Sequence, residues 1–214
     1  MENLHICIIG GTGRLGKRIV SLCPNHIIIC SKSNKEMLTD PKIDLFIDVS
    51  APNVIAPLLP LIIKSKKPLV VGSTGHNDLT MKELKKASAL IPLLIASNFS
   101  KGLFFLKRML KAFALTPSVI IDTHHIHKKD TPSGTAKELS LLYKEPPSII
   151  SHRTEEAIGT HSMLFTFPFE EIEIKHTAHF RELFAKGAIE ALSFLYQKEA
   201  GLYTMEDVYT KGSL

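Results

Sequence analysis

Short apolar runs alternate with helix-like stretches over the first 100 residues. Leu15, Ile19 and Leu22 recur at helical spacing after the first run. Residues 54–64 are also predicted to be helical, and Thr80 to Glu83 form a capping box that opens a helix through Ala89. Such alternation indicates parallel βαβ units in a doubly wound sheet. The expected strands are residues 4–9, 26–30, 45–49, 69–71 and 93–96.

Beyond residue 100 the pattern becomes that of an α+β unit. Ile172 and Ile174 alternate with charged residues, which is typical of a sheet with one solvated face. We therefore expect two domains, one formed by 1–100 with 182–214 packing back on it, the other by 101–181. The expected helices here are 102–115, 136–143 and 181–197, and the expected strands are 119–122, 162–167 and 171–175.

Composition and charge narrow the class of protein. Apolar residues make up 44% and charged residues 22% of the chain, which excludes a disordered chain. The net charge of +5 suits an anionic ligand. Nucleic acid is not expected, because the phenylalanines lie in core-like runs and tryptophan is absent. No signal peptide or membrane span is evident, so we expect a cytoplasmic protein without a membrane partner.

The three cysteines lie within the first 30 residues. Their odd number and lack of metal-ligand spacing argue against a secreted disulfide scaffold and against a zinc site. Cys7 and Cys30 lie inside apolar runs, which predicts buried free thiols.

A glycine-rich turn, Gly10-Gly11-Thr12-Gly13-Arg14-Leu15-Gly16, links the first expected strand to the first expected helix. Glycine is needed where the chain turns tightly and where a pyrophosphate approaches main-chain N–H groups, and the helix N-terminus adds partial positive charge. The strand–turn–helix context favours dinucleotide binding over a plain tight turn.

The end of the second strand bears on which dinucleotide binds. NAD-binding proteins place a carboxylate there for the ribose hydroxyls, whereas this chain has Ser31-Lys32-Ser33. A cation with hydroxyl donors suits a 2′-phosphate, so Lys32, with Arg14, favours NADPH over NADH. A solvated lysine on a turn is the alternative.

Residues 122–136, DTHHIHKKDTPSGTA, are the stretch richest in side chains that can bind a ligand or transfer a proton. Ser133, Gly134 and Thr135 fall at an expected helix N-terminus, where free N–H groups and hydroxyls can bind a carboxylate or phosphate. A neighbouring lysine supplies charge and a histidine supplies a proton near neutral pH. A basic loop without further function is the alternative.

A metal site built from His124, His125 and His127 is disfavoured. These residues include no i, i+4 pair on a helix, and the adjacent lysines would repel a dication. We expect no metal.

The segment resembles the signature of the 4-hydroxy-tetrahydrodipicolinate reductase family, the dihydrodipicolinate reductases of bacterial lysine and diaminopimelate synthesis. That signature is an acid, two histidines, a lysine and then Asp-x-Pro-Ser-Gly-Thr-Ala. Further stretches that match in order are Gly10–Gly16, Gly72-Ser73-Thr74-Gly75, Ala96–Ser100, Arg153 with Gly159-x-His161, Arg181 with Gly187-Ala188, and 201–208.

The resemblance implies a Rossmann-like domain and a substrate domain with a mixed sheet through which homotetramers form. It implies reduction of a cyclic imine dicarboxylate by NADPH or NADH. His124 and Lys128 would be the proton-transferring catalytic residues, and His125, Ser133, Gly134 and Thr135 would bind substrate. The cofactor-binding residues would be Gly10, Gly11, Thr12, Gly13, Arg14, Leu15, Gly72, Ser73, Thr74, Ala96, Ser97, Asn98 and Phe99, together with Lys32 from the phosphate argument.

A non-catalytic, nucleotide-sensing regulator of the same fold is the alternative function. It predicts cofactor binding without turnover. The presence of His124, Lys128 and the Ser133–Thr135 segment argues against it, because a decayed enzyme should lose such residues first.

Overall fold

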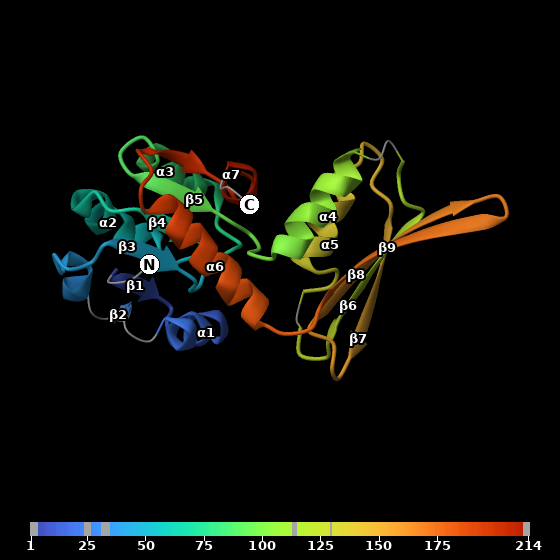
Figure 1. Ribbon diagram of the computed structural model, residues 1–214, viewed down its shortest axis with the longest axis horizontal. Coiled ribbons are helices and arrows are strands. Elements are labelled where there is room, and N and C mark those ends of the chain that lie inside the picture. The colour runs from blue at the N-terminus through green and yellow to red at the C-terminus, as the bar shows by residue number, and fades with distance from the viewer. Residues whose placement is uncertain (1–3, 24–26, 31–34, 113–114, 129, 212–214) are drawn as a thin grey trace. The chain divides into compact units, whose positions relative to one another are not determined.

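The computed structural model describes residues 4–23, 27–30, 35–112, 115–128 and 130–211. The chain forms two compact units. Unit 1 comprises Met1–Phe99 and Glu182–Leu214, and unit 2 comprises Ser100–Arg181. Figure 1 shows the elements of each unit.

Unit 1 is built on a parallel sheet with the strand order β10-β5-β4-β3-β1-β2. The strands are β1 (Ile6–Ile9), β2 (Ile27–Cys30), β3 (Leu45–Asp48), β4 (Leu69–Val71), β5 (Pro92–Ile95) and β10 (Gly201–Tyr203). The helices are α1 (Arg14–Leu22), η1 (Lys35–Thr39), η2 (Ala56–Leu58), α2 (Leu59–Ser65), α3 (Asp78–Ala87), α6 (Glu182–Leu195) and α7 (Met205–Lys211).

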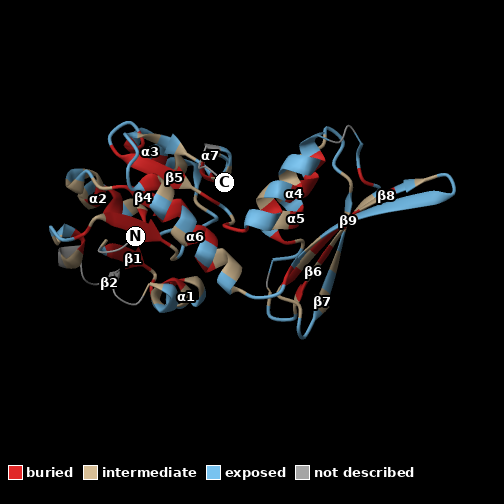
Figure 2. Ribbon diagram, viewed as in Figure 1, coloured by how far each residue is buried: buried red, intermediate tan, exposed pale blue. Residues whose placement is uncertain are grey.

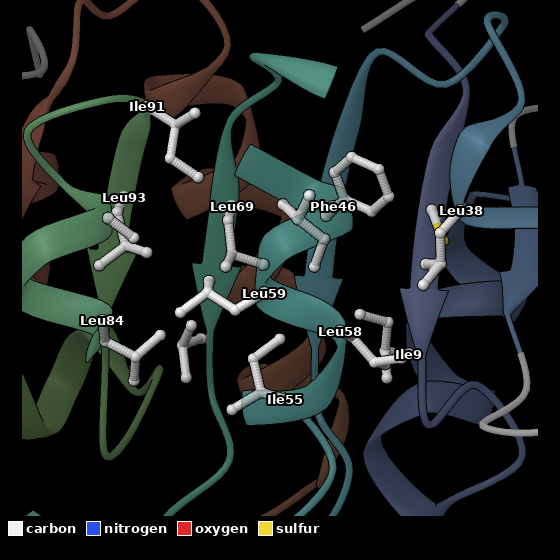
Figure 3. Close-up of a cluster of buried hydrophobic side chains, with 14 of the residues drawn as sticks. Ile9, Leu38, Phe46, Ile55, Leu58, Leu59, Leu69, Leu84, Ile91 and Leu93 are labelled. Atoms are coloured by element: carbon white, nitrogen blue, oxygen red, sulfur yellow. The ribbon is translucent and has the colours of Figure 1, made fainter. Parts of the chain in front are cut away.

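Both faces of this sheet are covered, because successive side chains of a strand point to opposite faces. On one face Phe46 and Leu69 pack with α2 and α3, and Figure 3 shows Leu58 and Leu59 of this cluster. On the other face Ile47 and Val70 pack with α1, α6 and α7. Burial on both faces explains why the strands read as continuous apolar runs.

Unit 2 is a mixed four-stranded sheet with the order β7-β6-β8-β9. β6 pairs parallel with β7 and antiparallel with β8, and β8 pairs antiparallel with β9. Its core joins the sheet to two helices, and Figure 2 shows that β9 is largely exposed. The elements are α4 (Lys101–Ala112), β6 (Val119–His125), α5 (Gly134–Ser140), β7 (Ser148–Thr154), β8 (Gly159–Phe167) and β9 (Glu170–Ala178).

The predicted fold class, a doubly wound parallel sheet with a second α+β unit and a mixed sheet, is confirmed. The compact units divide at Phe99/Ser100 and at Arg181/Glu182, beside the boundaries expected from the sequence. None of the described helices has the length and apolar character needed to cross a membrane.

Three local predictions were wrong. The α3 helix begins two residues before Thr80 and is capped by Asn77, whose Oδ1 accepts the Thr80 N–H at 2.8 Å, because an asparagine caps as well as a threonine. The expected strand 119–122 continues to His125, because β7 and β8 both supply ladder partners. β7 was missed, because its polar, half-exposed residues carry a weak apolar signal.

The prediction of a free thiol is also wrong for Cys7, which is disulfide-bonded. Cys23 is free and half-buried. An apolar run predicts that a cysteine is buried, but it does not predict whether its sulfur is a free thiol.

Candidate active site

The residues expected to bind the cofactor gather at one edge of the parallel sheet. Ile9 is in register with Asp48, Asp48 with Val71, and Val71 with Ile95. The chain order reverses between β1 and β3, and in open α/β sheets ligands bind at the carboxyl ends beside such a reversal. The loops that follow these aligned strand ends contain the glycine turn, Gly72–Thr74 and Ala96–Phe99.

The glycine turn is formed by close backbone packing. Gly10 has φ +88°, and its carbonyl accepts the Gly13 N–H at 2.9 Å. A Cβ on Gly16 would lie 2.3 Å from the Gly10 oxygen, so only glycine lets α1 start this close to β1. Gly13 caps α1 without a side chain, which leaves the first N–H groups open to a phosphate. The turn therefore fits a pyrophosphate.

A buried carboxylate organises the two neighbouring loops. Asp48 is fully buried, its Oδ1 accepts the Ser50 N–H at 3.1 Å, and Ser73 Oγ donates to its Oδ2. The Asp48 carbonyl accepts the Gly72 N–H at 2.8 Å. A Cβ on Gly72 would lie 2.5 Å from the Phe99 ring, so Phe99 and the Gly72 loop pack directly.

The remaining expected cofactor residues differ in exposure. Thr12, Arg14, Thr74 and Ser97 are exposed, and Gly11 and Ala96 are buried. Asn98 is half-buried, as is Leu15, which packs against the α6 side of the sheet. Lys32 and its neighbours Ser31 and Ser33 lie outside the described residues.

The chemistry of unit 2 centres on the fully buried carboxylate of Asp122 on β6. Its Oδ2 accepts the Ser133 N–H at 3.2 Å and the Ser151 hydroxyl at 3.1 Å, with Arg153 Nη1 at 3.4 Å. Burial alone would raise the pKa of Asp122, but the nearby His124 imidazole and the Ser133 donors hold it far below its usual range. Asp122 is therefore an anion throughout the neutral range.

Two buried histidines flank this anion. His124 Nδ1 lies 2.8 Å and His161 Nε2 lies 3.5 Å from Asp122 Oδ1, and the two rings meet edge to face at 5.2 Å. Burial, helped by the nearby His124, lowers the pKa of His161 to about 4 although Asp122 opposes the shift. His161 is therefore neutral at pH 7.

His125 does not join this group. It is the last residue of β6, and burial alternates along the strand so that Ile120, Asp122 and His124 share the buried face. His125 lies on the opposite, half-exposed face, where its ring is 6.3 Å from that of His127. The structure thus separates two histidines that are adjacent in sequence.

The lysine and the helix start are linked by a second acid. Lys128 Nζ lies 2.8 Å from Asp130 Oδ1, while Asp130 Oδ2 accepts the Gly134 N–H at 3.2 Å. Burial tends to raise the pKa of Asp130, but its contact with Lys128 outweighs that and lowers it. The carboxylate of Asp130 thus bridges an expected catalytic residue, Lys128, and an expected substrate-binding residue, Gly134.

Ser133 is the N-cap of α5, and its Oγ accepts the Ala136 N–H at 3.1 Å and lies 3.3 Å from His161 Nε2. The free N–H groups expected at this helix start are therefore partly used within the protein: Ser133 binds Asp122, Gly134 binds Asp130 and Ala136 binds Ser133. Thr135, the remaining residue expected to bind substrate, is half-buried in the first turn of α5.

One group of donor atoms in the described part of the chain has metal-ligand spacing. Atoms of Asp122, His124 and His161 lie within 4.8 Å of one another. This set differs from the three neighbouring histidines considered from sequence. Arg153 beside Asp122 opposes a dication here, and the absence of a metal stays a prediction.

No role was expected from the sequence for Asp122, Asp130, Arg153 or His161. Asp122 and Asp130 lie within the dense segment, and Arg153 and His161 within the matching stretch around Gly159. Their position within these motifs was the feature of the sequence that could have indicated a functional role. Their contacts depend on β7 and β8 lying on either side of β6.

Taken with its strand order and glycine turn, the fold defines a nicotinamide-dinucleotide-binding protein of the Rossmann type. Residues 23–99 match the family model "Dihydrodipicolinate reductase, N-terminus", and residues 102–209 match "Dihydrodipicolinate reductase, C-terminus". The chain belongs to the dihydrodipicolinate reductase family.

Individual relatives agree with this assignment. A 4-hydroxy-tetrahydrodipicolinate reductase of Xanthomonas campestris pv. campestris (strain B100) is 34% identical, with 96% of this chain and 97% of the relative covered. One from Exiguobacterium sibiricum is 32% identical, covering 95% and 96%. In fold, the chain is similar to a dipicolinate-bound dihydrodipicolinate reductase from Paenisporosarcina sp. TG-14, with a TM-score of 0.78, 19% identity, and 94% and 97% coverage.

Proposed function

We propose that this protein reduces 4-hydroxy-tetrahydrodipicolinate to tetrahydrodipicolinate, a step of lysine and diaminopimelate synthesis, using NADPH or NADH. The observation that carries the proposal is near-complete coverage, at 34% identity, of a relative that bears this name. The matched stretch includes His124, which contacts the buried Asp122, and Lys128, the two groups that would transfer protons.

The glycine turn and the two neighbouring loops would hold the cofactor. Gly10–Leu15 would contact the pyrophosphate, and Gly72–Thr74 and Ala96–Phe99 would line the nicotinamide side, with Asp48 fixing Ser73. When bound, the dihydronicotinamide supplies a hydride to the substrate. Exposed Arg14 is available to a 2′-phosphate, as Lys32 is expected to be, and on that ground we propose a preference for NADPH.

The residues of unit 2 would bind and protonate the substrate. The 4-hydroxyl group of the substrate is lost as water, which leaves a conjugated imine. Hydride attack on that system leaves electron density that must be protonated, and an imidazolium or ammonium group can supply the proton. His124 and Lys128 are the donors proposed for this step. Ser133, Gly134 and Thr135 would bind one substrate carboxylate. This carboxylate would replace that of Asp130 as the acceptor of the Gly134 N–H. His125 would contact substrate from the other face of β6.

A direct assay tests the proposal. The purified protein is given NADPH or NADH, and the substrate is generated in place by the upstream synthase. Turnover with NADPH well above that with NADH supports both the proposed reaction and the proposed binding of the 2′-phosphate by Lys32. Equal turnover with the two cofactors supports the reaction but contradicts the proposed role of Lys32. Tight cofactor binding without turnover would instead favour the nucleotide-sensing regulator.

Assembly and location remain predictions. We propose a homotetramer formed through unit 2, which light scattering of the purified protein would test. A cytoplasmic location is likewise expected.

A further inference from the structure

The strongest unassigned feature is the contact between Asp122 Oδ1 and His124 Nδ1. The two atoms are 2.8 Å apart, and the side chain of Asp122 is fully buried while that of His124 is 10% exposed. Both atoms are themselves buried. Their contact is short but does not meet full hydrogen-bond geometry, and neither atom makes a hydrogen bond to another described residue. A buried carboxylate oxygen requires a proton donor nearby, so the position of the histidine proton matters here.

The contact distance decides where that proton lies. Two unprotonated acceptor atoms 2.8 Å apart would place lone pairs against each other in a medium of low dielectric, which is strongly unfavourable. Asp122 is ionised, because Ser133, Ser151 and Arg153 all direct protons at its other oxygen. The proton in this contact therefore belongs to His124 Nδ1.

His161 is the poorer donor to this oxygen. Its Nε2 lies 3.5 Å from Asp122 Oδ1, against 2.8 Å for His124 Nδ1. His161 Nε2 also lies 3.3 Å from Ser133 Oγ, which accepts the Ala136 N–H. Asp122 Oδ1 is thus left to His124.

The other ring nitrogen of His124 faces a glycine. A Cβ built on Gly159 would lie 3.1 Å from His124 Nε2, so a larger residue would press on this atom. Because Nδ1 is enclosed beside Asp122, Nε2 is the only nitrogen through which His124 can exchange a proton with a ligand.

We propose that Asp122 is a positioning residue that keeps a proton on His124 Nδ1 and so makes Nε2 the proton-exchanging atom. Because Asp122 is fully buried, it would act through His124 and not by touching substrate or cofactor. Arg153, Ser151 and the Ser133 N–H hold its carboxylate in place. This inference rests on the proposed reductase function, since that function gives His124 its proton-transfer role.

The first test compares Asp122→Asn with wild-type protein and with Glu173→Gln, which removes a carboxylate from the exposed strand β9 of the same sheet. An asparagine amide can donate to Nδ1 and so stabilise the wrong tautomer. We expect kcat to fall by at least about 10²-fold, while KM for NADPH stays within about twofold of wild type. Glu173→Gln should behave as wild type. A folded Asp122→Asn protein with kcat within about threefold of wild type would overturn the proposal.

The second test needs no active variant. Two-bond ¹H–¹⁵N spectra of the wild-type protein distinguish the two neutral tautomers, and a His124→Gln sample assigns the signal. Protonated Nδ1 is expected, and an Nε2–H tautomer would overturn the proposal. If wild-type protein shows no reductase turnover, the proposed function fails, whereas the tautomer result still stands or falls on its own.

Discussion

The carboxylate of Asp130 lies 2.8 Å from Lys128 Nζ and also accepts the Gly134 N–H at 3.2 Å. It thus occupies a proposed proton donor, Lys128, and a group proposed to bind a substrate carboxylate, the Gly134 N–H. A dicarboxylate ligand would have to displace it.

Replacing Asp130 with asparagine should therefore strengthen dicarboxylate binding. An exposed ion pair contributes at most about 1 kcal/mol, so the gain should be up to about fivefold in Kd. Calorimetric titration with dipicolinate measures it. Glu138→Gln is the control, since Glu138 pairs with Lys107 between α4 and α5. Weaker binding to Asp130→Asn would show that Asp130 instead orders the loop for the ligand.

Lys128→Ala should lower kcat sharply and leave NADPH affinity nearly unchanged. Lys128 belongs to unit 2, whereas the proposed cofactor loops belong to unit 1. Steady-state kinetics and NADPH fluorescence titration separate the two effects. Collapse of NADPH binding would contradict the role given to Lys128.

Stability should depend on pH through His161. Its pKa is lowered to about 4 in the folded protein, against 6.5 ordinarily. As pH falls from about 6.5 to about 4, the unfolded chain takes up a proton that the folded chain does not. The free energy of unfolding therefore falls over this range, by up to about 3 kcal/mol, and this group adds no further loss below it.

Urea unfolding at pH 7 and pH 4.5 measures that loss. His161→Gln should show a smaller loss than wild type, and His127→Gln, an exposed histidine after β6, should show the wild-type loss. Equal losses in His161→Gln and wild type would remove His161 as the cause.

Gly16→Ala should destabilise the glycine turn. The added Cβ would lie 2.3 Å from the Gly10 oxygen and 2.6 Å from Gly11 Cα, so α1 must move away from β1. Overpacking of this kind costs about 1–3 kcal/mol, or roughly 3–10 °C in Tm, and cofactor affinity should fall too. Gly134→Ala is the matched control for Tm, because no heavy atom lies within 4 Å of its added Cβ. An unchanged Tm in Gly16→Ala would contradict this packing.

The sequence by itself determined the layered fold of unit 1. Runs such as Ile6–Ile9 are apolar at every position because both faces of a parallel sheet are buried, so they can be identified without knowing which strands lie beside them. The glycine turn Gly10–Gly16 could also be predicted from the sequence, because a strand–turn–helix with this packing requires glycine at fixed positions. The dense segment 122–136 identified the family and pointed to His124 and Lys128.

Only the tertiary structure decided which face of the sheet each histidine occupies and which carboxylates contact the histidines. His124 and His125 lie on opposite faces because β6 continues between β7 and β8, and the polar sequence of β7 gave no sign of that pairing. The contacts of Asp122 with Ser151, Arg153 and His161 join residues 29 to 39 positions apart in the chain. Such contacts arise from strand pairing across the sheet, which local sequence patterns do not encode.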